Sequence, residues 1–425
     1  MHRKVNNLNS FKAHPAWSEV QIICQNLVSN GFEALLAGGC VRDLVMNRMP
    51  KDFDIATNAT PDQIIELYPK ALSVGREFGV IILAFQNFQI EIASFRKDGP
   101  YLDGRRPSHI SFATPNEDAM RRDFTINALF LDLKEMHIID YVNGLTDIDA
   151  KIIRAVGDPE KRFSEDKLRM LRALRFSSQL EFKIDAKTLL AIENQSREIT
   201  VVSGERIKDE LTKWILSSNL KPCLMSLWST GLIRSIHPIF ENHFDQYEFD
   251  RILQFFSKDL SKLNALTKFG IFFSFITKQN QKDEFDRLKK ILKDLKFSSD
   301  QSAMLQWVLQ NSFNLVEFEK LRLSHQIEIC AHPYFKLLEE FTEATDLNIY
   351  SLLEPRFKRL KEEYLVDGQL PRPLINGDDL KLIGIKAGKD MGSLLSEIYS
   401  LQIEKELSSA DEARNYAKSR LKLQK

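Results

Sequence analysis

Short apolar runs near the start of the chain give way to long helical periodicity further on. Residues 32–37, 80–84 and 89–95 form runs that predict strands, whereas residues 16–30 have the period of an amphipathic helix. From about 218 to 345 the chain is rich in phenylalanine and keeps a helical pattern without strand alternation. The pattern therefore predicts a region of mixed strands and helices followed by a helical bundle with a phenylalanine core.

The strand predicted at 32–37 ends in two glycines, and two aspartates follow within a second apolar run. Gly38 and Gly39 allow the backbone to approach a ligand closely, and Arg42 lies in a segment compatible with a helix. Backbone N–H groups at a helix start, with a nearby arginine, suit phosphate. Asp52 and Asp54 are two residues apart, so in a strand both would point to one face. Paired carboxylates with phosphate oxygens suit Mg²⁺, and the combination predicts a site for a metal ion and a nucleotide.

Alternatives remain open for several of these features. Either motif alone is common in proteins without such a site, and no Gly-x-Gly-x-x-Gly follows the strand, which argues against a dinucleotide fold. Glu91 lies on one face of the strand predicted at 89–95, so it is either a third carboxylate beside the aspartate pair or a glutamate at the rim of the sheet. Residues 96–107, with Gly, Pro and mixed charge, predict a long loop that is either functional or merely solvated.

Arginines recur in two later segments. Arg121, Arg122 and Asn127 stand at the start of an apolar segment, where they are either phosphate and sugar ligands or parts of an ordinary capped element. Further on, Ser164 is expected to cap a helix in which polar residues recur every three positions. These residues are Asp166, Arg169, Arg172 and Arg175. They would form a slanted polar ridge, and the alternative to a binding role is a solvated charged face.

Composition narrows the classes of protein that fit. With 425 residues the chain is long enough for two to four domains, and its 59 basic and 59 acidic residues give no net charge. Any contact with nucleic acid must therefore come from local patches. No apolar run is long enough to span a bilayer, and the N-terminus lacks a signal-peptide core. The four cysteines lack metal-ligand spacing, which predicts reduced thiols and a cytoplasmic location.

A stretch containing Pro and Gly at 367–373 predicts a linker before the last segment. Asn376 is expected to cap a short helix that Gly384 ends, and Lys386 and Lys389 lie in the following bend. Helix ends with glycines and lysines suit a sugar-phosphate backbone, so this segment is a candidate for RNA binding.

In order and spacing, these motifs resemble the class II (bacterial-type) tRNA nucleotidyltransferase and poly(A) polymerase family, and within it the CCA-adding branch. The resemblance covers roughly the first 215 residues. The matching stretches are Gly38-Gly39-x-x-Arg42-Asp43 with Asp52-x-Asp54, Arg121-Arg122-Asp123-Phe124-Thr125-x-Asn127-Ala128, the connector at 140–154, Glu165-Asp166-x-x-Arg169-x-x-Arg172-x-x-Arg175-Phe176, and Glu205-Arg206-Ile207 with Glu210-Leu211. The loop at 96–107 resembles the family's mobile loop, residues 373–402 match the CCA-adding branch more weakly, and Cys40 departs from a more usual small apolar residue.

The resemblance implies a fold of the α+β class. It would comprise a polymerase-β-like nucleotidyltransferase head of mixed sheet and helices at 1–145 and a helical neck for base recognition at 146–217. A helical body at 218–345 and a helical tail that binds tRNA at 346–425 would follow.

The resemblance also implies a reaction, the template-independent addition of CMP and AMP from CTP and ATP to the 3′ end of tRNA by two-metal phosphoryl transfer. Mg²⁺ would be the cofactor, with no membrane and no obligate protein partner. An enzyme that adds only the terminal A and a bacterial poly(A) polymerase are alternatives within the family. A catalytically silent RNA-binding protein is a further alternative, against which the intact pair Asp52 and Asp54 argues.

Residue by residue, the resemblance implies roles for ten side chains or backbone positions. Asp52 and Asp54 would hold two Mg²⁺ ions. The triphosphate would lie against Gly39 and Arg42, with Arg122 and Asn127 beside the sugar and phosphates. Asp166 and Arg169 would read the edge of the base, supported by Arg172 and Arg175.

Overall fold

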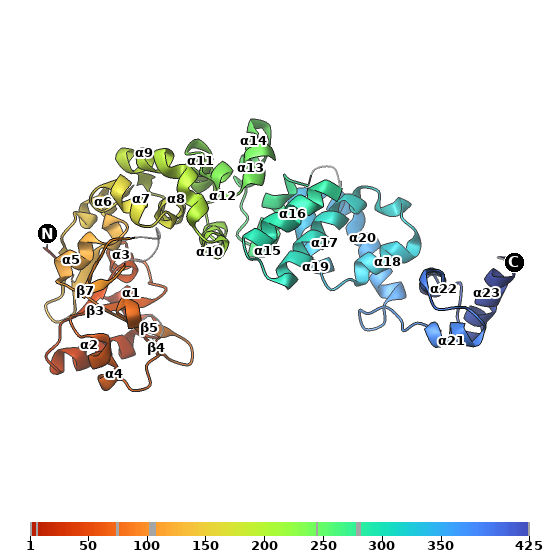
Figure 1. Cartoon of the computed structure of the whole chain (residues 1–425), viewed down its shortest axis with the longest axis horizontal. Coiled ribbons are helices and arrows are strands. Elements are labelled where there is room, and N and C mark those ends of the chain that lie inside the picture. Colours follow the sequence, from red (N-terminus) through yellow and green to blue (C-terminus); the bar gives the residue numbers. More distant parts are fainter. Residues whose placement is uncertain are drawn as a thin grey trace. The chain divides into compact units, whose positions relative to one another are not determined.

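The computed structural model of the chain describes residues 2–5, 7–73, 76–101, 108–243, 245–277 and 282–423. It divides into two compact units, residues 1–259 and 260–425 (Figure 1). Within the described residues of the first unit, a mixed sheet is accompanied by helices, whereas the second unit is helical. The predicted α+β class is confirmed.

A seven-stranded sheet among the described residues forms the centre of the first unit. Its strands, in spatial order, are β1 (His2–Lys4), β9 (His137–Asp140), β8 (Leu129–Asp132), β2 (Ala34–Ala37), β3 (Phe53–Thr57), β5 (Gln89–Ser94) and β4 (Val80–Ala84). The pair β3–β5 is parallel, and the other neighbours are antiparallel. Short two-stranded ladders join β6 (Arg96–Asp98) to β7 (Ile110–Phe112) and β10 (Ile152–Ile153) to β11 (Lys183–Ile184).

Both faces of the central strands are buried, which explains their continuous apolar runs. Leu35 and Ala37 of β2 belong to a buried cluster with Phe95 and Phe130. On β3, the ring of Phe53 packs against the rings of Phe11 and Trp17, with centroid distances of 5.0 and 5.8 Å. Trp17 is the first residue of helix α2 (Trp17–Ser29). The sheet thus holds the ends of β2 and β3 rigidly, and the candidate site lies at those ends.

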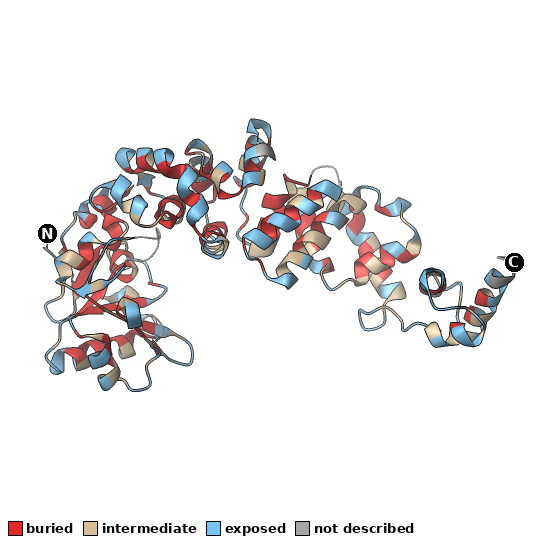
Figure 2. Ribbon diagram, in the orientation of Figure 1, coloured by how far each residue is buried: buried red, intermediate tan, exposed pale blue. Residues whose placement is uncertain are grey.

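Helices cover the sheet and continue beyond it in the first unit. They are α1 (Asn9–Lys12), α2 (Trp17–Ser29), α3 (Gly39–Val45), α4 (Pro61–Leu67), α5 (Pro115–Met120), α6 (Gly144–Ala150), α7 (Pro159–Glu165), α8 (Leu168–Leu180), α9 (Ala186–Gln195), α10 (Gly204–Ile215), α11 (Lys221–Ser229), α12 (Leu232–Ile236), α13 (Pro238–His243) and α14 (Gln246–Phe255), with 3₁₀ turns at Arg76–Phe78, Thr125–Asn127 and Ser196–Val201. Burial is confined to one side of many of these helices (Figure 2). Helix α4 begins with a reciprocal capping box between the side chains of Thr60 and Gln63.

The second unit has a phenylalanine-rich core and a separate small core near its end. Its helices are α15 (Ala265–Ser274), α16 (Lys282–Asp294), α17 (Ser299–Val316), α18 (Leu323–Ala331), α19 (Phe335–Thr345), α20 (Leu347–Tyr364), α21 (Gly377–Leu382), α22 (Lys389–Ile403) and α23 (Ala410–Leu423), with a 3₁₀ turn at Phe318–Lys320. Phe269, Phe273 and Phe297 pack ring against ring, as the sequence predicts. Asn376 caps α21 and Gly384 follows it with a φ of +91°, also as predicted. None of the helices described is both long and apolar enough to cross a membrane.

The helix predicted to start at Ser164 is wrong in its first turn. Ser164 lies inside α7, whose N-cap is Asp158, and the chain is extended at Asp166 before α8 begins at Leu168. The break is stabilised because the Asp166 carboxylate accepts hydrogen bonds from the Leu168 backbone and from a distant arginine, a contact that local spacing does not reveal. The polar ridge on α8 therefore contains only the three arginines.

Three smaller boundaries also differ from the predictions. The predicted loop at 96–107 begins as strand β6, which pairs with β7, and its part at 102–107 lies outside the described residues. The connector at 140–154 contains helix α6. Asp52 lies one residue before β3 rather than within it.

Candidate active site

A cavity of about 960 Å³ lies within the first unit, between the ends of the central strands and helices α8 and α10. All ten residues singled out from the sequence line it: Gly39, Arg42, Asp52, Asp54, Arg122, Asn127, Asp166, Arg169, Arg172 and Arg175. Glu91 lines it as well. The tertiary structure thus brings together positions that are more than 100 residues apart in sequence, with carboxylates at one part of the wall and arginines over much of the rest.

The acidic part of the wall is built by the parallel pair β3–β5. Asp54 of β3 is the register partner of Glu91 in β5, and Asp52 precedes β3. Burial and the negative charges of Glu91 and Asp52 raise the pKa of Asp54 to about 7, opposed by the positive charge of Arg122. Burial and the charge of Asp52 also raise the pKa of Glu91. Of the two interpretations of Glu91, the register favours a carboxylate beside the pair.

This crowding of negative charge fits a divalent cation, which would relieve the repulsion between the carboxylates. Among the residues that the structure describes, no group of three or more His, Cys, Asp or Glu side chains converges tightly enough to enclose an ion by itself. A cation here would therefore take the rest of its ligands from a bound phosphate and water, which is usual for Mg²⁺ with nucleotides.

The turn between β2 and α3 requires glycine at one position. Gly38 has a φ of +75°, and a Cβ atom built on it would lie 3.0 Å from Nη1 of Arg122 and 3.6 Å from Oδ2 of Asp54. A side chain at this position would displace the arginine and crowd the carboxylate. The glycine therefore permits Arg122 to lie beside the acidic part of the wall.

Arg42 is fixed by polar contacts on two sides. Its Nη1 donates to Oδ1 of Asn127 at 2.6 Å, and its Nε and Nη2 donate to Oδ1 of Asp43 at 2.9 and 2.7 Å. The Nδ2 group of Asn127 donates in turn to Oδ1 of Asp123 at 3.3 Å. These bonds connect α3 to the 3₁₀ turn at Thr125–Asn127 and hold both side chains in place at the wall of the cavity.

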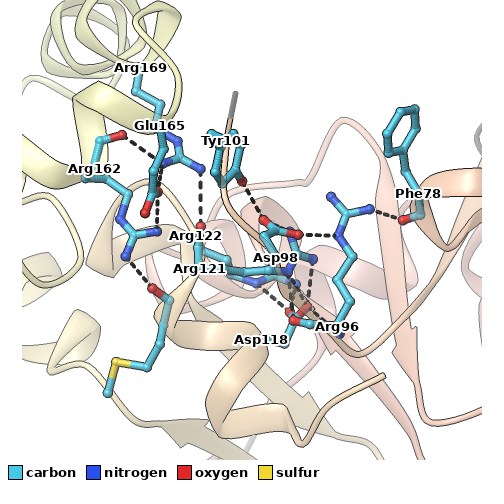
Figure 3. Close-up of polar contacts among 11 residues, drawn as sticks. Phe78, Arg96, Asp98, Tyr101, Asp118, Arg121, Arg122, Arg162, Glu165 and Arg169 are labelled. Atoms are coloured by element: carbon cyan, nitrogen blue, oxygen red, sulfur yellow. Dashed lines mark hydrogen bonds and ion pairs between the residues drawn. The ribbon is translucent and has the colours of Figure 1, made fainter. Parts of the chain in front are cut away.

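The break between α7 and α8 places Asp166 and Arg169 together. Nη1 and Nη2 of Arg206, in α10, donate to the two carboxylate oxygens of Asp166 at 3.2 and 2.7 Å. Nη1 of Arg169 donates to Oε2 of Glu165 at 2.7 Å and to the Arg162 carbonyl at 2.9 Å (Figure 3). Both side chains are therefore oriented before any ligand binds.

The other two arginines of α8 are held by the carboxylates of Asp123, which is nearly buried, and Glu210, which is buried. Arg172 donates from Nε and Nη2 to Oδ2 of Asp123 at 2.8 and 2.6 Å, and Nε of Arg175 donates to Oε2 of Glu210 at 2.5 Å. Burial alone would raise the pKa of Asp123, but the charge and hydrogen bonds of Arg172 lower it to about 2. Arg172 and Arg175 thus act as supports that connect α8 to the head and to α10.

Sequence reasoning assigned no role to the partners of these side chains, among them Arg206, Glu210 and Asp118. Arg206 and Glu210 lie in stretches that match the family. Their positions near the start and middle of one helix, α10, could have indicated a contact with α8. Asp118, which contacts Arg121 and Arg122, stood outside every motif, and nothing in its local pattern marked it.

Comparisons with known proteins agree with this arrangement. Residues 34–154 match the family model of the poly A polymerase head domain, and residues 181–244 match a model described as the probable RNA and SrmB-binding site of polymerase A. The CCA-adding enzyme of Staphylococcus haemolyticus is 32% identical over 398 residues, which cover 90% of this chain and 92% of that one. That of Lactobacillus helveticus is 32% identical over 399 residues, covering 92% and 94%. A match to the CCA-adding enzyme of Staphylococcus epidermidis is 44% identical over 210 residues, which cover 49% of this chain and 52% of that protein.

Solved structures agree in fold. The Bacillus stearothermophilus CCA-adding enzyme in complex with CTP superposes with a TM-score of 0.78 at 24% identity, covering 97% of this chain and 99% of that one. The Thermotoga maritima CCA-adding enzyme complexed with tRNA gives a TM-score of 0.64 at 18% identity, covering 99% of each chain. At these identities the likeness shows the shared fold.

Proposed function

The chain belongs to the family of CCA-adding enzymes, and on that basis we propose that it adds CMP and AMP from CTP and ATP to the 3′ end of tRNA. The observation that carries this proposal is the single cavity in which the carboxylates of Asp52, Asp54 and Glu91 face a wall rich in arginines. Such a cavity suits a nucleoside triphosphate whose phosphates need positive charge and whose reacting phosphorus needs a metal ion nearby.

The acidic residues supply the metal site in this proposal. Asp52 and Asp54 would hold Mg²⁺, and Glu91, beside Asp54 in the sheet, would add negative charge to the same site. When bound there, the ions supply Lewis-acid stabilisation of the phosphoryl oxygens and lower the pKa of the attacking hydroxyl group. Burial raises the pKa of Asp54, and repulsion from Glu91 and Asp52 raises it further; a bound cation would relieve this repulsion, which supports the assignment.

The arginines and the glycine turn orient the triphosphate. Arg42 and Arg122 both line the cavity, and Cβ atoms built on Gly38 and Gly39 would lie 3.0 Å from Nη1 of Arg122 and 3.6 Å from Nη2 of Arg42. They would bind the phosphates while the backbone of Gly39 approaches closely, and Asn127 would contact the sugar. Phosphoryl transfer depends on such positioning and on charge rather than on a covalent nucleophile.

Asp166 and Arg169 are proposed to choose the base. A carboxylate accepts a hydrogen bond from the exocyclic amine of C or A, and an arginine donates to the neighbouring ring acceptor, a pattern that U and G lack on that edge. The bidentate contact from Arg206 orients the Asp166 carboxylate for this task, and Arg172 and Arg175 support α8 behind it.

We further propose the four-part division into head (1–145), neck (146–217), body (218–345) and tail (346–425), with the tail binding tRNA. Lys386 and Lys389, next to the end of α21 and the start of α22, support a role for the tail in phosphate contacts. A cytoplasmic location is favoured by the four cysteines, which are all buried and free.

A direct test is to incubate the purified protein with tRNA that ends before CCA, with CTP and ATP separately and together, and to sequence the 3′ ends. The expected product is CCA when both nucleotides are present, and none with Asp54→Ala, which should still bind tRNA. An enzyme that extends only tRNA ending in CC, with a single A, would identify the A-adding alternative. The match to a poly A polymerase head domain favours poly(A) synthesis as the second candidate, which long A tracts on unstructured RNA would identify.

A further inference from the structure

A buried carboxylate outside the proposed set contacts two adjacent arginines at the edge of the site. Asp118 in α5 is 1% exposed. Its Oδ2 accepts from Nε and Nη2 of Arg122 at 3.1 and 2.9 Å, and its Oδ1 accepts from Nε of Arg121 at 2.8 Å, with Nη2 of Arg121 at 2.6 Å. The backbone N–H of Arg96 also donates to Oδ1, at 3.3 Å. Figure 3 shows Asp118 where these groups meet.

Asp118 is a rigid anion. Burial alone would raise its pKa, but the charges and hydrogen bonds of Arg122 and Arg121 bring the pKa below its usual value. Helix α5, which carries it, starts with a reciprocal capping box between Thr114 and Glu117. Its negative charge and its position are therefore both fixed before a ligand binds.

The contact decides which end of the Arg122 guanidinium faces the cavity. Asp118 occupies the edge formed by Nε and Nη2, which leaves Nη1 at the other end of the group. Nη1 donates to the Asn127 carbonyl at 3.3 Å, and a Cβ atom built on Gly38 would lie 3.0 Å from Nη1 and 3.6 Å from Oδ2 of Asp54. The guanidinium also packs over the ring of Phe130, with Cζ 5.0 Å from the ring centroid. The Nη1 end, which does not contact Asp118, therefore lies at the part of the cavity wall that Asp54 lines.

We propose that Asp118 is the positioning residue that directs Arg122 toward the triphosphate of the incoming nucleotide. This inference rests on the function proposed above. Asp118 neutralises one of the two positive charges of Arg121 and Arg122 and leaves one for the phosphates. Because a guanidinium recognises phosphate through a planar fork, its orientation matters as much as its charge. The entropy cost of orienting Arg122 is therefore part of the free energy of folding, and it does not weaken nucleotide binding.

The first test is Asp118→Asn, which keeps the shape of the side chain but loses the charge and one acceptor. The KM values for CTP and ATP should both rise at least tenfold, because Arg122 would contact the phosphates and not the base. The dissociation constant for tRNA should stay within twofold. A change confined to one of the two nucleotides would overturn the proposal.

A double-mutant cycle separates positioning through Arg122 from a general loss of structure. Arg122→Lys keeps the charge but lacks the fork, so adding Asp118→Asn in that background should raise the KM values less than twofold further. Additive effects would mean that Asp118 acts independently of Arg122, and would refute the inference.

Asp147→Asn is the matched control. Asp147 is also buried in the first unit and paired with an arginine, Arg154, but neither residue lines the cavity. Its replacement should lower the melting temperature and leave both KM values within twofold of wild type. An equal rise in KM for both variants would indicate that Asp118 is only structural.

A second variant covers the case in which Asp118→Asn does not fold. Asp118→Glu retains the charge and both acceptors but is longer by one methylene group, so it should keep the fold, displace the guanidinium and raise both KM values. Unchanged KM values in folded Asp118→Glu would overturn the proposal. Failure of the wild-type protein to add C or A to tRNA would instead refute the proposed function, and equilibrium binding of CTP with Mg²⁺ to the variants then tests the position of Arg122 alone.

Discussion

Asp166 lines the cavity and is held by Arg206 through both carboxylate oxygens, which fixes its orientation. Asp166→Ala should retain some turnover but lose rejection of UTP and GTP. Loss of one such hydrogen-bond partner costs about 1–3 kcal/mol, which corresponds to roughly ten- to hundredfold in selectivity. The measurement is kcat/KM for each of the four nucleotides.

The matched control for this variant is Asp149→Ala, since Asp149 pairs with Arg3 on the surface and its side chain is 58% exposed. This control should keep the preference for C and A. If Asp166→Ala still incorporates only C and A, another group reads the base.

The lowered pKa of Asp123 predicts that the free energy of unfolding depends on pH. Burial would raise its pKa, but Arg172 lowers it to about 2, below the usual value of 3.8. A depressed folded-state pKa stabilises the protein above the unfolded-state pKa, and this stabilisation is lost as the pH falls toward 2. The full effect is about 2.5 kcal/mol, of which roughly 1 kcal/mol should disappear between pH 5 and pH 3.

Chemical denaturation of wild type and Asp123→Asn across that pH range measures this contribution. The difference between their free energies of unfolding should shrink by roughly 1 kcal/mol from pH 5 to pH 3. A difference that is independent of pH would show that the pair with Arg172 does not lower the pKa.

At the scale of elements, the packing of α10 against α8 depends on a buried charge. Glu210 accepts from Arg175 at 2.5 Å and lies 3.8 Å from Nη1 of Arg172, and its side chain is 3% exposed. Glu210→Gln leaves buried Arg175 without its counter-charge, so we expect a loss of about 3–5 kcal/mol in the free energy of unfolding of the first unit. Thermal melting of the wild type and of Glu210→Gln measures this loss.

Asp62→Asn provides the comparison, because Asp62 also pairs with an arginine, Arg76, but the side chains of Asp62 and Arg76 are 67% and 57% exposed. This variant should lose less than about 1 kcal/mol. Equal losses in the two variants would contradict the assigned role of burial at Glu210.

At the scale of the whole molecule, the last helices form a small core of their own. Ile375, Leu380, Met391, Ile398, Ala413 and Ala417 are buried together, which makes this segment removable as one piece. Truncation before Asp367 should weaken tRNA binding at least tenfold at moderate salt and lower the salt slope by about 1 for each lost phosphate contact. Addition to a short unstructured RNA at saturating concentration should hardly change.

Removing the segment also removes Glu404, which accepts hydrogen bonds from Arg322 and from the backbone of Ser324 at the start of α18. Glu404→Gln in the full-length chain therefore serves as a control, since it breaks this contact and keeps the lysines. Unchanged tRNA binding by the truncated protein would refute the assignment of the tail.

Local chemistry allowed much of the fold and part of the site to be predicted from the sequence. The strand that ends before Gly38, the cap at Asn376 and the strands β4 and β5 follow from periodicity and side-chain geometry within a few residues. The acidic pair and the arginines of α8 were visible for the same reason, because their spacing is short. These features depend on interactions between near neighbours, which the sequence contains in full.

The tertiary structure decided which distant groups neutralise one another. Parallel pairing of β3 with β5 places Glu91 beside Asp54, Arg206 reaches Asp166 across 40 residues, and Asp118 fixes Arg122. The interruption of the helix at Asp166 also depends on a distant partner, because Arg206 binds the Asp166 carboxylate. A buried charge is stable only with a partner, and the partner is set by how elements pack rather than by spacing along the chain. The sequence therefore determined the chemical groups of the site, and the packing of the first unit determined their orientation.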